Sequence, residues 1–141
     1  MSSGIEADVA ESERALVDTS AWIEYLRATG SPVAARVERL LLAGRAVWCD
    51  MVILELWNGA RAGKEQRALV KLATVVEPVA TDAETWRVAH RLARCCRGAG
   101  VTVPATDILI AACAEQRALG VVHQDGDFDA IGAARAASKD A

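Results

Sequence analysis

Short apolar runs alternate along the chain with longer segments whose apolar residues recur every three or four positions. The short runs are typical of buried strands and the longer period of amphipathic helices. Strands are predicted at Leu16–Val17, Ala46–Cys49, Val75–Val79 and Val121–His123. Helices are predicted over Ala21–Arg27, from Pro32 to about Ala43, from Met51 to about Arg61, along the basic stretch to Lys71, from Thr81 or Asp82 to Gly98 or Gly100, from Pro104 to Gly120, and around Ile131. This alternation predicts an α/β fold.

Two aspartates follow predicted strands. Asp18 comes directly after Val17, and the hydroxyls of Thr19 and Ser20 are suited to cap the next helix. Asp125 follows the last strand, in a turn that contains Gly126. A carboxylate at a strand end faces the crevice where α/β sheets bind ligands. Taken alone, Asp125 is equally explained as a turn former.

Two further acids stand on helical faces that are not typical of surface carboxylates. Glu55 shares its face with apolar or small residues: Met51, Val52, Asn58, Gly59 and Ala62. Asp107 shares its face with Ile110, Ala111 and Ala114. Each also has a simpler explanation, because a lone glutamate is usually exposed and an aspartate in a first turn interacts favourably with the helix dipole.

Carboxylate oxygens from separate parts of a chain suit hard cations such as Mg²⁺ or Mn²⁺, whereas zinc prefers histidine or thiolate. If the four acids converge, their repulsion requires a cation. A bound cation activates water and stabilises charge on a phosphate, so the predicted reaction is metal-dependent hydrolysis of a phosphodiester. Arg87, Arg91 and Arg94 are predicted to position RNA, with an ordinary solvated basic face as the alternative.

Composition limits the organisation of the chain. A length of 141 residues predicts one domain, expected at 14–134, between a disordered acidic extension at 1–13 and a frayed tail at 135–141. No apolar run reaches the ~18 residues of a membrane span, and no secretory signal is evident, so a cytoplasmic protein is expected. The four cysteines lack zinc spacing and are expected to be buried thiols. A net charge of −3 argues against bulk electrostatic binding of nucleic acid.

Four segments resemble the acidic motifs of PIN-domain ribonucleases, most closely the VapC toxins of type II toxin–antitoxin systems. They are Val17–Trp22 (VDTSAW), Ile53–Leu56 (ILEL), Pro104–Ala112 (PATDILIAA) and Asp125–Phe128 (DGDF). The resemblance implies that Asp18, Glu55, Asp107 and Asp125 bind the metal. It also implies a mostly parallel central sheet between helices, a homodimer, a VapB-type antitoxin partner, and cleavage of structured RNA such as tRNA or rRNA.

Secondary candidates for the site are Asp127, Thr19, Ser20 and His123. Asp127 matches a further acidic position of the family. His123 stands where the family often has a hydroxyl, and it is expected to hydrogen-bond Asp125, to contact RNA or to finish the strand.

Two other functions fit parts of the pattern. A phosphohydrolase of the haloacid dehalogenase type also begins with a strand-end aspartate, but it needs a second aspartate two residues later, where this chain has Ser20. A catalytically inactive PIN-like module would bind RNA but would have lost an acid, whereas all four acids are present here.

Overall fold

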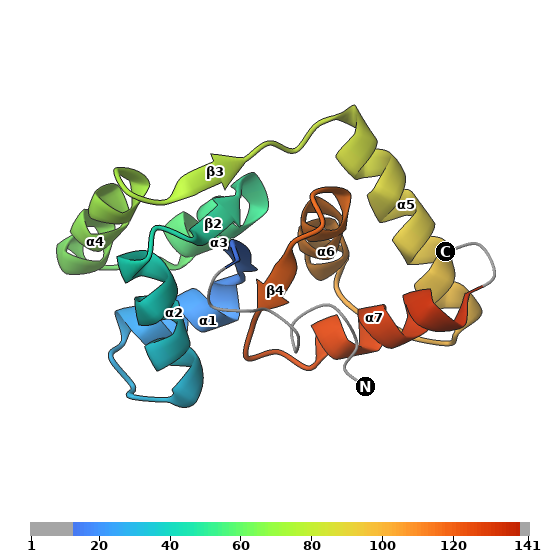
Figure 1. Ribbon diagram of the computed structural model, residues 1–141, viewed down its shortest axis with the longest axis horizontal. Helices are drawn as coiled ribbons and strands as arrows, with labels where there is room; N and C mark the ends of the chain where they lie inside the picture. Colours follow the sequence, from blue (N-terminus) through green and yellow to red (C-terminus); the bar gives the residue numbers. More distant parts are fainter. Residues whose placement is uncertain (1–12, 139–141) are drawn as a thin grey trace.

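A computed structural model describes residues 13–138 and contains one parallel sheet with helices around it (Figure 1). The strands are β1 (Ala15–Val17), β2 (Ala46–Cys49), β3 (Glu77–Val79) and β4 (Gly120–Val122), in the order β3-β2-β1-β4. The helices are α1 (Thr19–Leu26), α2 (Pro32–Leu42), α3 (Asp50–Gly59), α4 (Gly63–Ala73), α5 (Ala83–Gly98), α6 (Ala105–Gln116) and α7 (Asp127–Ala137). The predicted α/β fold with a parallel sheet is therefore confirmed.

The sheet is buried where helices cover it. Every residue of β1 and β2 is buried, as expected for parallel strands covered on both faces. β3 lies at the edge and is largely exposed, and Pro78 is tolerated there because an edge strand does not need every backbone donor. In Figure 1, α2 and α4 lie toward the left of the sheet, and α5, α6 and α7 form a cluster to its right.

Several element boundaries differ from the sequence prediction. The first helix begins at Thr19, and Asp18 rather than a hydroxyl caps it. Cys49 takes the N-cap position of α3, so Asp50 is its first residue. Pro104 precedes α6 as its N-cap, and α6 ends at Gln116 because Ala118 has a positive φ of 53°.

The predicted frayed tail is wrong in its first part. α7 continues to Ala137, with Ala134 buried and Arg135 paired with Glu115 of α6. These contacts give the last turns a packing partner that periodicity alone did not reveal. The end of the predicted tail, 139–141, and residues 1–12 of the predicted extension lie outside the described part of the chain.

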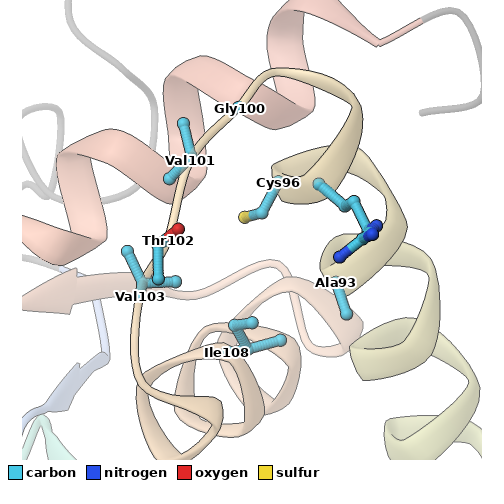
Figure 2. Close-up of a pocket in the computed structure, with 8 residues that line it drawn as sticks. Ala93, Cys96, Gly100, Val101, Thr102, Val103 and Ile108 are labelled. Atoms are coloured by element: carbon cyan, nitrogen blue, oxygen red, sulfur yellow. The ribbon is translucent and has the colours of Figure 1, made fainter.

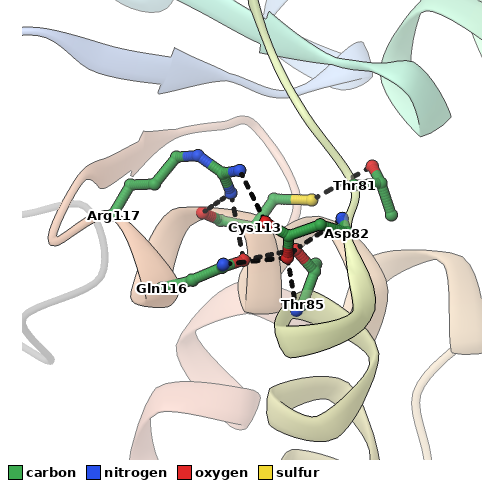
Figure 3. A network of polar contacts seen from close by, with 6 residues as sticks. All are labelled: Thr81, Asp82, Thr85, Cys113, Gln116 and Arg117. Carbon is green, nitrogen blue, oxygen red and sulfur yellow. Dashed lines mark hydrogen bonds and ion pairs between the residues drawn. The ribbon is translucent and has the colours of Figure 1, made fainter.

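A polar network joins the start of α5 to the end of α6 (Figure 3). Asp82 caps α5 by accepting from the Thr85 backbone N–H at 3.0 Å, and it also accepts from Gln116 Nε2 at 2.9 Å. Arg117 approaches the same carboxylate at 3.9 Å. The Gln116 and Thr85 hydrogen bonds and the Arg117 charge lower the pKa of Asp82 to about 2. The network fixes α5 against α6, the helix that carries Asp107.

None of the helices within residues 13–138 has the length and apolar character needed to cross a membrane.

Candidate metal centre and active site

Asp18 stands where β1 and β4 end side by side. Its backbone N–H donates to the Val122 carbonyl at 2.9 Å, which continues the parallel pairing of the two strands. Its Oδ2 accepts from the Ser20 backbone N–H at 3.0 Å and from the Ser20 hydroxyl at 2.7 Å. Ser20 Oγ in turn accepts from the Gln124 backbone N–H at 2.9 Å. One serine thus connects the β1 carboxylate to the loop that follows β4.

The other oxygen of Asp18, Oδ1, is buried and has no hydrogen-bond partner within residues 13–138. Asp18 is only 2% exposed, and burial raises its pKa, with a smaller contribution from the Asp125 charge, while the Ser20 hydrogen bonds oppose the shift. A buried carboxylate oxygen without a partner is costly in a native protein. A cation would satisfy this oxygen and remove the penalty.

Three carboxylates come together beside the β4 end. Asp107, Asp125 and Asp127 each offer an oxygen, and these oxygens lie within 4.8 Å of one another. Asp127 also donates its backbone N–H to Asp125 Oδ1 at 2.9 Å, so the two acids of this turn hold each other in place. This donor set of oxygens alone fits a hard divalent cation.

Asp107 is the most perturbed member of the cluster. Its residue is 7% exposed, and burial followed by the Asp125 charge raises its pKa to about 8. Asp18 adds to the same shift, so the first and third predicted acids are electrostatically coupled. Burial beside other carboxylates therefore favours the protonated form of Asp107 when no cation is bound.

Glu55 is attached to the site differently. Its Oε1 accepts from the Thr19 hydroxyl at 2.6 Å, which links α3 to the start of α1 beside Asp18. Its oxygens are not part of the three-carboxylate cluster, whereas Asp127, a secondary candidate from sequence, is. Of the four predicted ligands, the fold brings Asp107 and Asp125 into the cluster, places Asp18 within electrostatic range, and connects Glu55 through Thr19.

His123 supports the loop that carries Asp125. Its Nδ1 accepts from the Asp125 backbone N–H at 3.2 Å, so the expected hydrogen bond involves the backbone and not the carboxylate. Its Nε2 lies 3.6 Å from Asp129 Oδ1, too far for a hydrogen bond, and its ring packs 5.1 Å from Phe128. With its side chain only 6% exposed, His123 is not placed to contact RNA, and it lies one residue beyond β4 instead of within it.

The three predicted RNA-positioning arginines have different surroundings. Arg87 pairs with Glu84 at 2.7 Å, and Arg91 pairs with Glu115, which also holds Arg135. Arg94 is exposed.

The bridging role of Ser20 was not predicted from the sequence. The available signal was the position of Ser20 two residues after the strand-end acid.

Comparison with known proteins agrees with this geometry. The sequence model of the PIN domain matches residues 15–134. The chain is 41% identical over 120 residues to the VapC ribonuclease Mb1587 of Mycobacterium bovis, a match that covers 82% of this chain and 90% of that protein. Ribonuclease VapC11 of Mycobacterium tuberculosis matches with the same identity and coverage.

Solved structures show the same architecture. VapBC-5 of Mycobacterium tuberculosis, a member of the VapBC family of toxin–antitoxin systems, matches with a TM-score of 0.63 and 26% identity over 84% of this chain and 90% of that chain. FitAcB of Neisseria gonorrhoeae matches with a TM-score of 0.61 and 21% identity over 84% of this chain and 92% of that chain. The second likeness supports the fold alone.

Proposed function

The chain belongs to the PIN domain family, and we propose that it is a divalent-metal-dependent endoribonuclease that acts as the toxin of a type II toxin–antitoxin pair. The observation that carries this proposal is the convergence of the Asp107, Asp125 and Asp127 oxygens, with the buried Asp18 carboxylate in electrostatic range and its Oδ1 without a hydrogen-bond partner within residues 13–138. The curated relatives named as VapC ribonucleases support the reaction, with most of their length matched.

Asp107, Asp125 and Asp127 would hold the cation, with Asp18 beside them. When bound, Mg²⁺ or Mn²⁺ supplies a Lewis acid that stabilises negative charge on a phosphodiester and favours attack by water. The remaining residues keep the acids in place. Ser20 orients Asp18, His123 holds the Asp125 backbone, and the Thr19 hydroxyl fixes one oxygen of Glu55. Glu55 keeps its other oxygen for the cation or a water molecule.

The protein partner in this proposal is a VapB-type antitoxin, and the active species is a homodimer in the cytoplasm. The solved VapBC-5 structure from Mycobacterium tuberculosis is a toxin–antitoxin system, which supports the pairing. Leu54 and Trp57 on α3 and Val70 on α4 are exposed large apolar side chains, and α3 packs against α4. A partner that covers them gains apolar burial. The proposed substrate is a structured RNA, tRNA or rRNA.

The test compares wild type with Asp107→Asn and with Asp50→Asn, a matched control at an exposed carboxylate outside the cluster. Wild type and Asp50→Asn are expected to cleave total RNA with Mg²⁺ or Mn²⁺ and to be inactive in excess chelator. Asp107→Asn should lose activity by orders of magnitude while remaining folded, because it keeps its shape but loses a ligand charge. Mapping the new RNA ends then identifies the substrate.

Three results would contradict the proposal or part of it. Undiminished cleavage in chelator would remove the metal from the reaction. Equal cleavage by wild type and Asp107→Asn would show that the acidic cluster is not the active site. Absence of a complex with any co-expressed VapB-type antitoxin would contradict the toxin assignment but leave the nuclease.

A further inference from the structure

The exposed face of α5 carries an aromatic pair in line with cations. Trp86 is 48% exposed, and its ring centroid lies 6.5 Å from that of His90 one turn later. A helical step of about 100° per residue places Trp86, His90 and Arg97 within roughly 40° of one another, with Arg94 at the border of this face. We call Trp86, His90, Ala93, Arg94 and Arg97 the α5 face.

The cations of this face differ from the other arginines of the helix. Arg87 and Arg91 are paired with Glu84 and Glu115, whereas Arg94 and Arg97 have no carboxylate partner within residues 13–138. Arg97 in the last turn interacts favourably with the helix dipole. That interaction explains neither Arg94 nor the half-exposed Trp86, which lies about three turns before Arg97.

The α5 face continues into a pocket between the end of α5, the segment that follows it and the first turn of α6 (Figure 2). The pocket has a volume of about 520 Å³, within the range typical of small-ligand sites. Ala93 and Arg97 line it from the α5 face, the Gly100–Val103 segment forms its other side, and Ile108 of α6 closes it. Ile108 is the residue after Asp107, so the pocket adjoins the helical turn that carries the most perturbed acid of the cluster.

We propose that the α5 face and this pocket bind a single-stranded segment of RNA next to the cleavage site. Trp86 stacks on a base with His90 behind it, and Arg94 and Arg97 contact phosphates on the way to the pocket. The distance along the helix from Trp86 to Arg97 is roughly 16 Å at 1.5 Å per residue, enough for a few nucleotides. This inference rests on the proposed ribonuclease function and assigns its substrate-binding surface.

Charge favours RNA over a second copy of the chain on this face. A twofold interface brings the same patch of each subunit together, so Arg94 and Arg97 would meet their own counterparts. Such like charges repel unless acids separate them, and the described α5 face contains no acid. A polyanion with flat bases matches both the unpaired cations and the exposed indole.

The experiment measures binding of a fluorescein-labelled 12-nucleotide mixed-sequence RNA by anisotropy in excess chelator, so that cleavage does not interfere. Trp86→Ala is compared with Leu42→Ala, which removes an exposed large apolar side chain from α2. Arg94→Gln/Arg97→Gln is compared with Lys64→Gln/Arg67→Gln, which removes the same charge from exposed positions of α4. Circular dichroism and thermal unfolding verify the fold of each variant.

Trp86→Ala is expected to weaken binding by roughly 5- to 100-fold, the range of one base stack, while Leu42→Ala binds like wild type. The Arg94→Gln/Arg97→Gln variant should bind more weakly and lose about 1.4 from the slope of log K against log salt, since each phosphate contact on a single strand contributes about 0.7. The α4 pair should leave the slope unchanged.

Wild-type binding by both α5 variants would overturn this inference, and the nuclease assignment would stand if metal-dependent cleavage persisted. If the α5 variants lose binding but the wild-type protein never cleaves RNA, the proposed function is refuted and the RNA-binding surface is kept. Light scattering measures the oligomeric state of wild type and Trp86→Ala and tests a third outcome. If Trp86→Ala dissociates an oligomer, the α5 face is a subunit interface and the proposal fails.

Discussion

Asp107→Asn is expected to stabilise the metal-free protein near neutral pH. Burial and the neighbouring Asp125 charge raise the pKa of Asp107 from 3.8 to about 8. Between these values the folded state binds a proton that the unfolded state has released, so stability falls as pH rises from about 4 to 8. Asparagine keeps the shape and carries no charge to desolvate, which removes this loss.

The size of the effect follows from the linkage relation. At pH 7 the pH is about 3 units above the pKa of the Asp107 carboxyl in the unfolded state, and each unit corresponds to 1.36 kcal/mol. The Asp107 carboxyl therefore lowers the free energy of unfolding at pH 7 by at most ~4 kcal/mol. Relaxation and water penetration reduce it, and a gain of a few kcal/mol is expected for Asp107→Asn. Below about pH 4, the free energies of unfolding of wild type and Asp107→Asn should differ little.

Urea unfolding in excess chelator measures the gain in stability directly. The proteins compared at pH 4.5 and 7.5 are wild type, Asp107→Asn and Asp50→Asn. Wild type should lose stability between the two pH values and Asp107→Asn should lose less, while the exposed control should differ from wild type by less than about 1 kcal/mol. Added Mg²⁺ should stabilise wild type more than Asp107→Asn, because binding to the folded state alone raises stability. An Asp107→Asn protein no more stable than wild type at pH 7.5 in chelator would refute the electrostatic account of the cluster.

Two further predictions concern the groups that hold the site in place. Ser20→Ala removes a hydrogen-bond donor to Asp18 and an acceptor for the Gln124 backbone N–H, so the pKa of Asp18 should rise further. Metal-dependent cleavage should fall by roughly tenfold, and the pH–rate profile should shift to higher pH. An unchanged profile would show that the serine bridge is incidental. Asp82→Ala should lower the urea midpoint of unfolding at pH 7. The difference in midpoint from wild type should shrink as pH falls from about 4 toward 2, because the depressed pKa of Asp82 stabilises the folded state only while the carboxyl is ionised. A difference independent of pH would assign the whole effect to the lost helix cap.

Local patterns were enough to find most of the elements and the candidate acids. Strand β2 has the predicted bounds, and α5 begins after Asp82 as expected. Hydrophobic period and capping chemistry depend on residues a few positions apart, so they can be read in one dimension. The face containing Asp107, Ile110, Ala111 and Ala114 was correctly identified as buried for the same reason.

Neighbours distant in sequence decided the rest. Arg91 pairs with Glu115, a contact that the sequence did not reveal, and α7 continues past the expected end because its last turns pack and pair with α6. None of these partners lies within a helical turn of the residue it affects.

The sequence by itself determined an α/β chain with acids at strand ends and on buried helical faces, together with the oxygen chemistry that such acids offer a cation. Only the tertiary structure decided which acids meet. The order β3-β2-β1-β4 places β1 beside β4, so Asp18 lies next to a loop more than 100 residues away, and Ser20 bonds Gln124 at |i−j| = 104. The turn after β4 brings Asp127 into the cluster, whereas Glu55 is connected to the site through the Thr19 hydroxyl. The convergence of these acids depends on strand order and on how the helices dock, and no local hydrophobic period encodes either.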